Sequence, residues 1–226
     1  MSRPRVKPDA AVLEATFRVM GRVGPSRFTL AAVARECGLA PATLVQRFGS
    51  KRGLLLAMAR QGSGGAADCF ARVRAAHRSP LAAVVAAFEE MTCLVETPEA
   101  MANNLAWFQI DLTDPDFHAV ALEQAKDTMA GFRRLLDEAV ETGELVACDT
   151  RRLGRALHAA ATGSMFAWAI FRQGKVRRWL RTDLETVLAP YRPKQPEHGR
   201  PEHAGPGATG APATGDKTPP YASRRA

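Results

Sequence analysis

Residues 29–48 read TLAAVARECGLAPATLVQRF, and this stretch decides the fold of the N-terminal part of the chain. Thr29 is a suitable N-cap, because its side-chain oxygen can accept a hydrogen bond from a free N–H group at the start of a helix. Apolar residues then recur at the spacing of one helical face, at Leu30, Val33, Ala34 and Cys37. Gly38 follows, where a helix commonly ends in a left-handed residue. The pattern predicts a short helix over 29–37 that ends in a tight turn.

A second short helix is predicted directly after the turn, over 41–48. Pro41 suits its first position, where no backbone N–H is needed, and Leu39 is placed to pack between the two helices. At 100° per residue, Leu44 and Phe48 face inward. The outer arc holds Ala42, Thr43, Gln46 and Arg47. This is the geometry of a helix-turn-helix, whose second helix enters the major groove of DNA.

The outer arc of this second helix suits the reading of base pairs. Gln46 and Arg47 can pair with base edges or phosphates, and Ala42 and Thr43 can contact thymine methyl groups. A helical hairpin with a structural role would bury the same apolar residues. That alternative gives no reason for small residues at the start of the second helix beside an excess of basic charge. We therefore favour DNA recognition.

The basic charge is concentrated at one end of the chain. The net charge is +8, and residues 1–60 hold 11 Lys and Arg against 3 Asp and Glu, while the remainder is balanced. A basic segment on a neutral body is typical of a localised site for a polyanion. Two alternatives stay open: a solvated basic surface, and a protein that binds DNA without regard to sequence. The second would be expected to spread its basic residues over the whole chain.

The N-terminal segment also resembles the DNA-binding domain of the TetR family of transcription regulators. The resemblance covers residues 9–60 without a gap. It is carried by 12–17 (VLEATF), 19–20 (VM), Gly24, 28–30 (FTL), 33–34 (VA), 38–39 (GL), 43–44 (TL), Phe48 and 50–51 (SK). Residues 61–191 are similar to the family only in the number and length of their helices.

The resemblance implies roles for particular residues. Thr29 matches the cap of the helix whose N–H groups lie at a phosphate, Thr43 a contact of the recognition helix, and Lys51 a lysine that contacts DNA. This sequence departs from the family at three positions. Val45 replaces a tyrosine that touches the DNA backbone, Ala42 replaces a glycine, and Ala40 replaces a Ser or Thr cap. Ala40 leaves the first N–H groups of the recognition helix to water or phosphate.

The rest of the chain predicts an all-α fold, because helical periodicity recurs and no stretch alternates with period two. We expect ten helices, at 9–23, 29–37, 41–48, 51–61, 64–78, 80–96, 98–111, 115–142, 149–173 and 177–189. We expect a flexible basic arm (1–8), a helix-turn-helix domain (9–60), a helical ligand-sensing and dimerisation domain (61–191) and a disordered tail (192–226). The tail is rich in proline and lacks core-forming side chains.

The helix predicted over 149–173 carries a stripe of small residues. It runs through Ala156, Ala160, Gly163, Ala167 and Ile170. The opposite side of the helix is also apolar, so both faces need cover. A stripe of this kind permits close packing against a second copy of the chain, with burial inside one chain as the alternative. The resemblance to TetR regulators implies the same homodimer, since their last two helices form the dimer interface.

The resemblance further implies a small-molecule pocket among the middle helices. Polar groups among aromatic side chains are what such a pocket needs, and they occur at Asn103, Asn104, Trp107, Phe108 and His118. Aromatic residues at these positions are equally explained as ordinary core, and His118 as exposed. The expected mode is repression of a palindromic operator, relieved by an effector of unknown identity.

Nothing in the sequence favours an enzyme or a cofactor. No nucleotide-binding, metalloprotease or hydrolase motif is present, and the histidines show no catalytic or metal-ligating spacing. The four cysteines lie far apart, at Cys37, Cys69, Cys93 and Cys148. They form no Cys-x-x-Cys pair, so neither a zinc site nor a disulfide framework is expected. No run is long and apolar enough for a membrane span, and no signal peptide is recognisable, so we expect a cytoplasmic protein.

Overall fold

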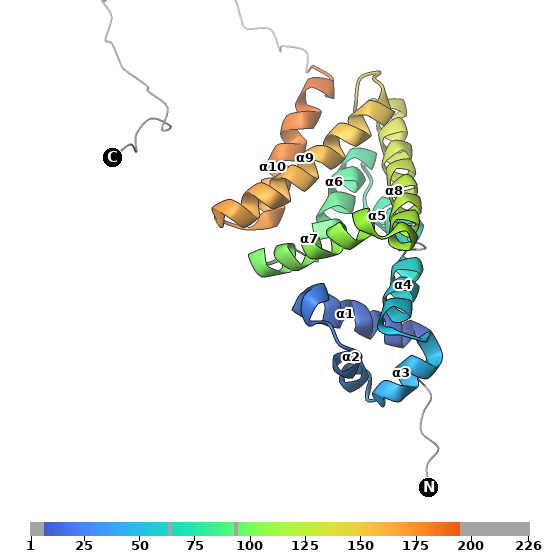
Figure 1. Ribbon diagram of the computed structural model, residues 1–226. Helices are drawn as coiled ribbons and strands as arrows, with labels where there is room; N and C mark the ends of the chain where they lie inside the picture. Colours follow the sequence, from blue (N-terminus) through green and yellow to red (C-terminus); the bar gives the residue numbers. More distant parts are fainter. Residues whose placement is uncertain (1–6, 63–64, 93–94, 195–226) are drawn as a thin grey trace, which may run out of the picture. The chain divides into compact units, whose positions relative to one another are not determined.

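The computed structural model describes residues 7–62, 65–92 and 95–194, and this part of the chain is helical with no strand. The all-α prediction is therefore confirmed. Figure 1 shows the helices. They are α1 (Asp9–Arg27), α2 (Leu30–Cys37), α3 (Pro41–Phe48), α4 (Lys51–Gly62), α5 (Gly65–Ala76), α6 (Pro80–Met91), α7 (Pro98–Thr113), α8 (Pro115–Glu141), α9 (Thr150–Phe171) and α10 (Val176–Leu188), followed by a 3₁₀ turn, η2 (Ala189–Tyr191). Most of the predicted arm and tail, 1–6 and 195–226, lies outside the described residues.

Local sequence signals explain where the helices start. Five of them begin behind a side chain that accepts a hydrogen bond from an N–H group of the first turn. These caps are Thr29, Ser79, Thr97, Asp114 and Asp149. Four helices have proline as their first residue, which needs no hydrogen-bond acceptor there.

The predicted helix ends need two corrections. The first helix was expected to stop at residue 23, but helical residues continue to Arg27 beyond a break at Gly24, whose φ is 69°. Gly24 is required there for a second reason, since a Cβ atom would lie 2.3 Å from the side-chain oxygen of Asn103 in α7. The sixth helix was expected to reach residue 96 but ends at Met91.

The larger core lies between α5, α6, α8, α9 and α10. Three phenylalanines mark its centre: Phe88 stacks on Phe132 with 3.9 Å between ring centroids, and Phe70 meets Phe132 edge-on at 4.9 Å. The helices α9 and α10 pack along each other, and α10 buries one side of its surface through Val176, Leu180, Leu184 and Leu188. The spacing of these four residues is that of an amphipathic helix.

A second core lies under the helix-turn-helix, and it extends beyond the N-terminal helices. Val12, Phe28 and Leu44 belong to it, together with Trp107 of α7 and Phe117 of α8. Asn103, one turn before Trp107, donates a hydrogen bond to the backbone oxygen of Gly21 in α1 at 3.0 Å. The N-terminal helices and the larger helical part are therefore joined by buried side chains.

The tight contact between α5 and α8 yields a stability prediction. A Cβ atom at Gly131 would lie 2.3 Å from the ring of Phe70. We expect Gly131→Ala to destabilise the fold by about 1–3 kcal/mol through overpacking, despite the better helix propensity of alanine. The matched control is Gly21→Ala, because Gly21 has no atom near its Cβ position. Chemical denaturation measures both, and equal effects of the two changes would contradict the proposed clash.

Candidate nucleic-acid interface

The turn between α2 and α3 has the predicted helix-turn-helix geometry. The Thr29 side chain accepts a hydrogen bond from the Ala32 N–H at 3.1 Å, so it caps α2 as expected. Gly38 is left-handed, with φ of 66°, and Leu39 donates its N–H to the carbonyl of Ala34 at 2.8 Å. This hydrogen-bonded turn ends α2 and starts α3 two residues later.

The recognition helix α3 is held from below by a single fully buried residue, Leu44. Phe48 and Leu39 pack on the same core and are half-buried. Ala40 has no side chain that caps α3, as the sequence predicted. The first N–H groups of α3 are therefore available to an outside acceptor.

The exposed residues of α3 differ from those predicted for its outer arc. Ala42 and Gln46 are exposed, as expected, and Thr43 is half-buried. Val45 is also exposed, at 45%, although it was not among the predicted readers. The free surface of the recognition helix thus consists mainly of methyl groups and one amide.

The placement of Arg47 on the free outer arc was wrong. Its side chain is only 20% exposed, and it pairs with the carboxylate of Asp9 in the first turn of α1. Its Nε donates to Asp9 Oδ1 at 2.8 Å, and its guanidinium lies 5.6 Å from the centroid of the Phe48 ring. Asp9 was not among the residues predicted to matter at this interface. The only signal in the sequence was its position in the first turn of a helix. Local periodicity does not link Asp9 to Arg47, which lies 38 positions later.

A cationic edge lies beside the capped start of α2. Lys51 places its ammonium group 3.4 Å from the carbonyl of Pro25 and 5.5 Å from the centroid of the Phe28 ring. Arg27, at the end of α1 and two residues before Thr29, is exposed and forms no ion pair within the described residues. A helix N-terminus with nearby cations is a favourable position for a phosphate group.

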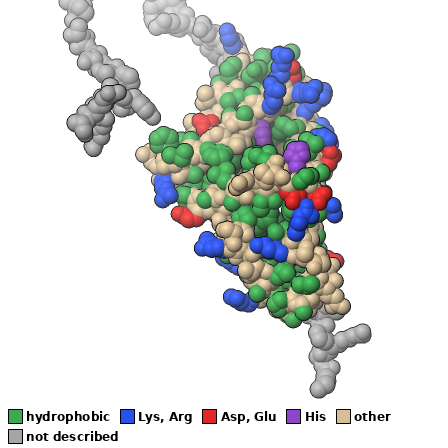
Figure 2. Space-filling model, viewed as in Figure 1, with side chains coloured by type: hydrophobic (Ala, Val, Ile, Leu, Met, Phe, Trp, Pro, Cys, Tyr) green, Lys and Arg blue, Asp and Glu red, His purple; other side chains and the backbone are tan. Residues whose placement is uncertain are grey.

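Other basic residues of this region are occupied by internal ion pairs. Arg22 and Arg18 of α1 bind Glu36 of α2, at 3.0 and 3.5 Å, and the hydrogen bond from Arg22 lowers the pKa of Glu36. Arg52 of α4 binds Asp114 and Asp116 at the start of α8, at 2.8 and 2.7 Å. Its hydrogen bond is the main reason why the pKa of Asp114 is lowered. Figure 2 shows the Lys and Arg side chains on the surface formed by α1 to α4.

The five predicted pocket residues have two different kinds of surroundings. Asn103 binds backbone oxygens of α1, and Trp107 is 8% exposed and belongs to the core beneath the helix-turn-helix. Asn104, Phe108 and His118 are exposed. The structure thus places Asn103 and Trp107 at the junction between α7 and α1.

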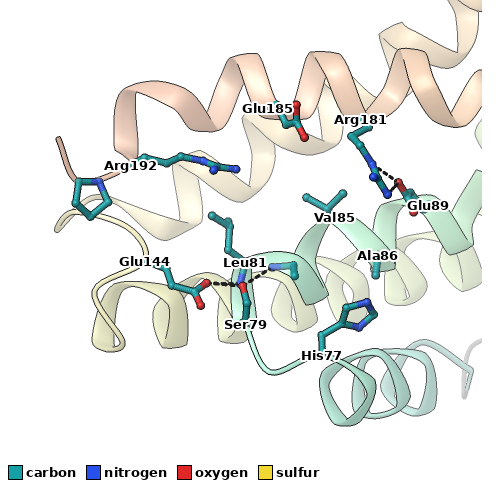
Figure 3. Close-up of a pocket in the computed structure, with 12 residues that line it drawn as sticks. His77, Ser79, Leu81, Val85, Ala86, Glu89, Glu144, Arg181, Glu185 and Arg192 are labelled. Carbon is teal, nitrogen blue, oxygen red and sulfur yellow. Dashed lines mark hydrogen bonds and ion pairs between the residues drawn. The ribbon is translucent and has the colours of Figure 1, made fainter. Parts of the chain in front are cut away.

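A groove of about 600 Å³ lies elsewhere, between α6 and α10 (Figure 3). Its floor is apolar and is formed by one side of α6, through Leu81, Ala82, Val85 and Ala86. Two internal pairs border it: Ser79 donates to Glu144 at 2.8 Å, and Arg181 donates to Glu89 at 2.8 Å. Glu185 and Arg192 line the groove without an ion-pair partner among the residues that the structure describes. The combination of an apolar floor with a few polar groups is typical of small-molecule sites.

The small-residue stripe of α9 lies on the surface. Leu153, Leu157 and Trp168 of the same helix are buried, whereas Ala156 and Gly163 are exposed, and a Cβ atom at Gly163 would meet nothing. Ala160 and Ala167 are half-buried, and Ile170, at the end of the stripe, is 76% exposed. Figure 2 shows apolar side chains gathered where α9 ends and α10 begins. An apolar face thus remains uncovered in the single chain.

The fold recurs in solved structures of regulators. It is similar to a TetR transcription regulator from Haloarcula marismortui (TM-score 0.63, 16% identity, covering 82% of this chain and 98% of that one). It is also similar to a TetR transcriptional regulator from Streptomyces coelicolor (TM-score 0.62, 21% identity, covering 83% and 100%). A third is SmeT of Stenotrophomonas maltophilia (TM-score 0.60, 18% identity, covering 84% and 92%). Among curated proteins, none matches the sequence at a significant level.

The chain thus combines a helix-turn-helix segment with an all-helical body, as these solved structures do. Residues 12–58 match the family model described as "Bacterial regulatory proteins, tetR family", so this segment is similar to the N-terminal domain of that family. Within the described ranges, no helix is long and apolar enough to cross a membrane, and no cluster of three potential metal ligands occurs.

The cap at Thr29 yields a direct prediction. Thr29→Ala removes the acceptor for the Ala32 N–H, so we expect a loss of about 1 kcal/mol in the free energy of unfolding. Thr29→Ser keeps the hydroxyl group and is the matched control, which should retain most of the stability. Urea denaturation compares the three proteins. A serine variant as unstable as the alanine variant would show that the methyl group, not the hydrogen bond, matters.

Proposed function

We propose that the protein is a homodimeric repressor that binds a palindromic DNA operator and releases it when a small molecule binds. The observation that carries the proposal is the exposed face of α3, which stands beside a cationic, capped helix start. The first feature suits base edges and the second suits the phosphate backbone. Among the similar structures, SmeT is described as a repressor of a multidrug efflux pump.

The docking mode follows from this arrangement. The helix α3 enters the major groove, where Ala42, Thr43 and Gln46 meet base edges. The N–H groups at the start of α2, capped by Thr29, and the ammonium group of Lys51 hold phosphates on the same side. Contacts of the second kind set the position of the protein on DNA, and contacts of the first kind select the sequence.

The second copy of the chain covers the exposed stripe on α9. Small side chains at Ala156, Ala160 and Gly163 let a partner helix approach closely, and Ala167 and Ile170 extend the apolar contact. A two-fold dimer presents two recognition helices to half-sites roughly 34–36 Å apart, which is one turn of DNA. A two-fold protein therefore requires a palindromic operator.

The effector occupies the groove between α6 and α10. This replaces the expected pocket at Asn103, Asn104, Trp107, Phe108 and His118, none of which lines the groove. A change at the larger domain has a route to DNA binding, because Trp107 and Asn103 of α7 contact the core and the backbone of α1. For the effector to release the operator, it must bind the DNA-free conformation more tightly than the DNA-bound conformation.

Two rival functions explain fewer of these features. A nonspecific DNA-binding protein would not need an uncharged, exposed recognition face, because nonspecific affinity comes from phosphates. An enzyme would need a cluster of reactive side chains, and two of the groove's carboxylates are already engaged, Glu89 by Arg181 and Glu144 by Ser79. The ratio of specific to nonspecific affinity separates the first rival from the proposed regulator.

The dimer proposal is tested by Gly163→Arg. The side chain has room in the single chain, so the fold should persist, but the bulk and charge should prevent close approach of a partner. Duplexes selected from a random pool by the wild-type protein should be palindromic, and the variant should be monomeric and fail to retain them. Sedimentation, circular dichroism and a mobility-shift assay on one preparation provide the answer. A dimeric variant that binds normally would place the interface elsewhere.

The groove is tested by Ala86→Trp, which fills the space above its floor. We expect the variant to bind the amphipathic anion 1-anilinonaphthalene-8-sulfonate several-fold more weakly, while its affinity for the selected operator stays within about twofold, as α6 lies outside the helix-turn-helix core. The matched control is Ala130→Trp on the exposed side of α8, which should leave the dye affinity unchanged. Equal dye binding by all three proteins would remove the groove from consideration.

A further inference from the structure

The single cation of the recognition helix is turned away from its free face. Arg47 is the only charged residue of α3, and two of its guanidinium nitrogens donate to Asp9 Oδ1. The same guanidinium also lies against the ring of Phe48. Asp9 sits in the first turn of α1, where the helix dipole favours a negative charge. The ion pair is therefore stabilised at Arg47 by the Phe48 ring and at Asp9 by the dipole of α1.

The side chains that remain free on α3 share one chemical character. Ala42 and Val45 present methyl groups, and Gln46 presents an amide, with the half-buried hydroxyl of Thr43 beside them. In the major groove, a glutamine amide pairs with N6 and N7 of adenine, and methyl groups contact the C5-methyl of thymine. Guanine is read chiefly by arginine or lysine, through its O6 and N7 atoms.

Two cations at the start of α4, which follows α3, contact other parts of the chain. Lys51 is the first residue of α4, and its ammonium group reaches the last turns of α1, where it donates to the carbonyl of Pro25. Arg52 is bound to Asp114 and Asp116. Both side chains are thus held by partners outside α3. Within the described part of the chain, the centre of the exposed face of α3 is therefore uncharged.

We infer that each operator half-site is read at A·T base pairs through Ala42, Val45 and Gln46, and that Asp9 is a positioning residue that withholds Arg47 from guanine. The inference rests on the proposed function, since it specifies the sequence class that the same interface selects. Val45 becomes a reader of thymine methyl groups. The Asp9–Arg47 ion pair then affects which bases are selected, although Asp9 itself contacts no base.

The experiment is selection from a pool of random duplexes by full-length wild-type protein and three variants, followed by sequencing. Wild-type protein should select a palindrome whose half-sites hold A·T pairs at the positions under α3. Gln46→Ala should lower the preference for adenine at one position of each half-site by about tenfold or more. Arg47→Gln should leave the selected bases unchanged, because the wild-type arginine does not read them.

Asp9→Ala supplies the decisive result. It frees Arg47, so a preference for guanine should appear at one position of each half-site, and the double variant Asp9→Ala with Arg47→Gln should lose it again. The matched control is Glu14→Ala, which removes an exposed carboxylate from the same helix and should raise affinity without a new guanine preference.

The outcomes separate this inference from the proposed function. Failure of the wild-type protein to select any palindrome would overturn both. A wild-type half-site with a guanine that disappears in Arg47→Gln would overturn the inference and leave the regulator intact. An unchanged motif in Asp9→Ala would remove the positioning role of Asp9, and circular dichroism of each variant confirms that the comparison concerns folded protein.

Discussion

The structure depends on one constraint: the eight-residue helix α3 is too short to be stable or oriented by itself. Its geometry comes from its surroundings, through the buried side chain of Leu44 below it and the hydrogen-bonded turn at Gly38 before it. Burial of Leu44 stabilises the helix by about 2 kcal/mol, more than any exposed contact on its surface. The orientation and stability of this short helix therefore depend on the core beneath it.

That core is not confined to the DNA-binding helices. Trp107 and Phe117, which come from α7 and α8, complete it, and Asn103 fits against the backbone at Gly24, where α1 breaks. Arg52 adds an ion pair from α4 to the start of α8. Because these contacts involve both packing and hydrogen bonds, a shift of α7 or α8 changes the support of α3. The proposed effector in the larger domain would act on DNA affinity through this junction.

Two different kinds of exposed surface lie in different parts of the molecule: cations near α2 and apolar side chains on α9. At the DNA-binding end, internal pairs consume several arginines, so the remaining cations flank the capped start of α2 rather than covering the whole domain. At the other end, α9 leaves small and apolar side chains such as Gly163 and Ile170 uncovered. The first arrangement favours phosphates at defined positions, and the second favours a second copy of the chain.

The helices, their caps at Thr29 and Gly38, and the inward direction of Leu44 were predictable from the sequence, because these features depend on neighbours within a few residues. The sequence also indicated that α9 has two apolar faces. The tertiary structure alone decided which α9 face is buried, that Trp107 and Asn103 contact α1, and that Arg47 pairs with Asp9. Each of these facts joins residues distant in the chain, and helical periodicity gives the direction of a side chain but not the identity of its partner. The free face of α3 was therefore predictable in position, and its charge was not.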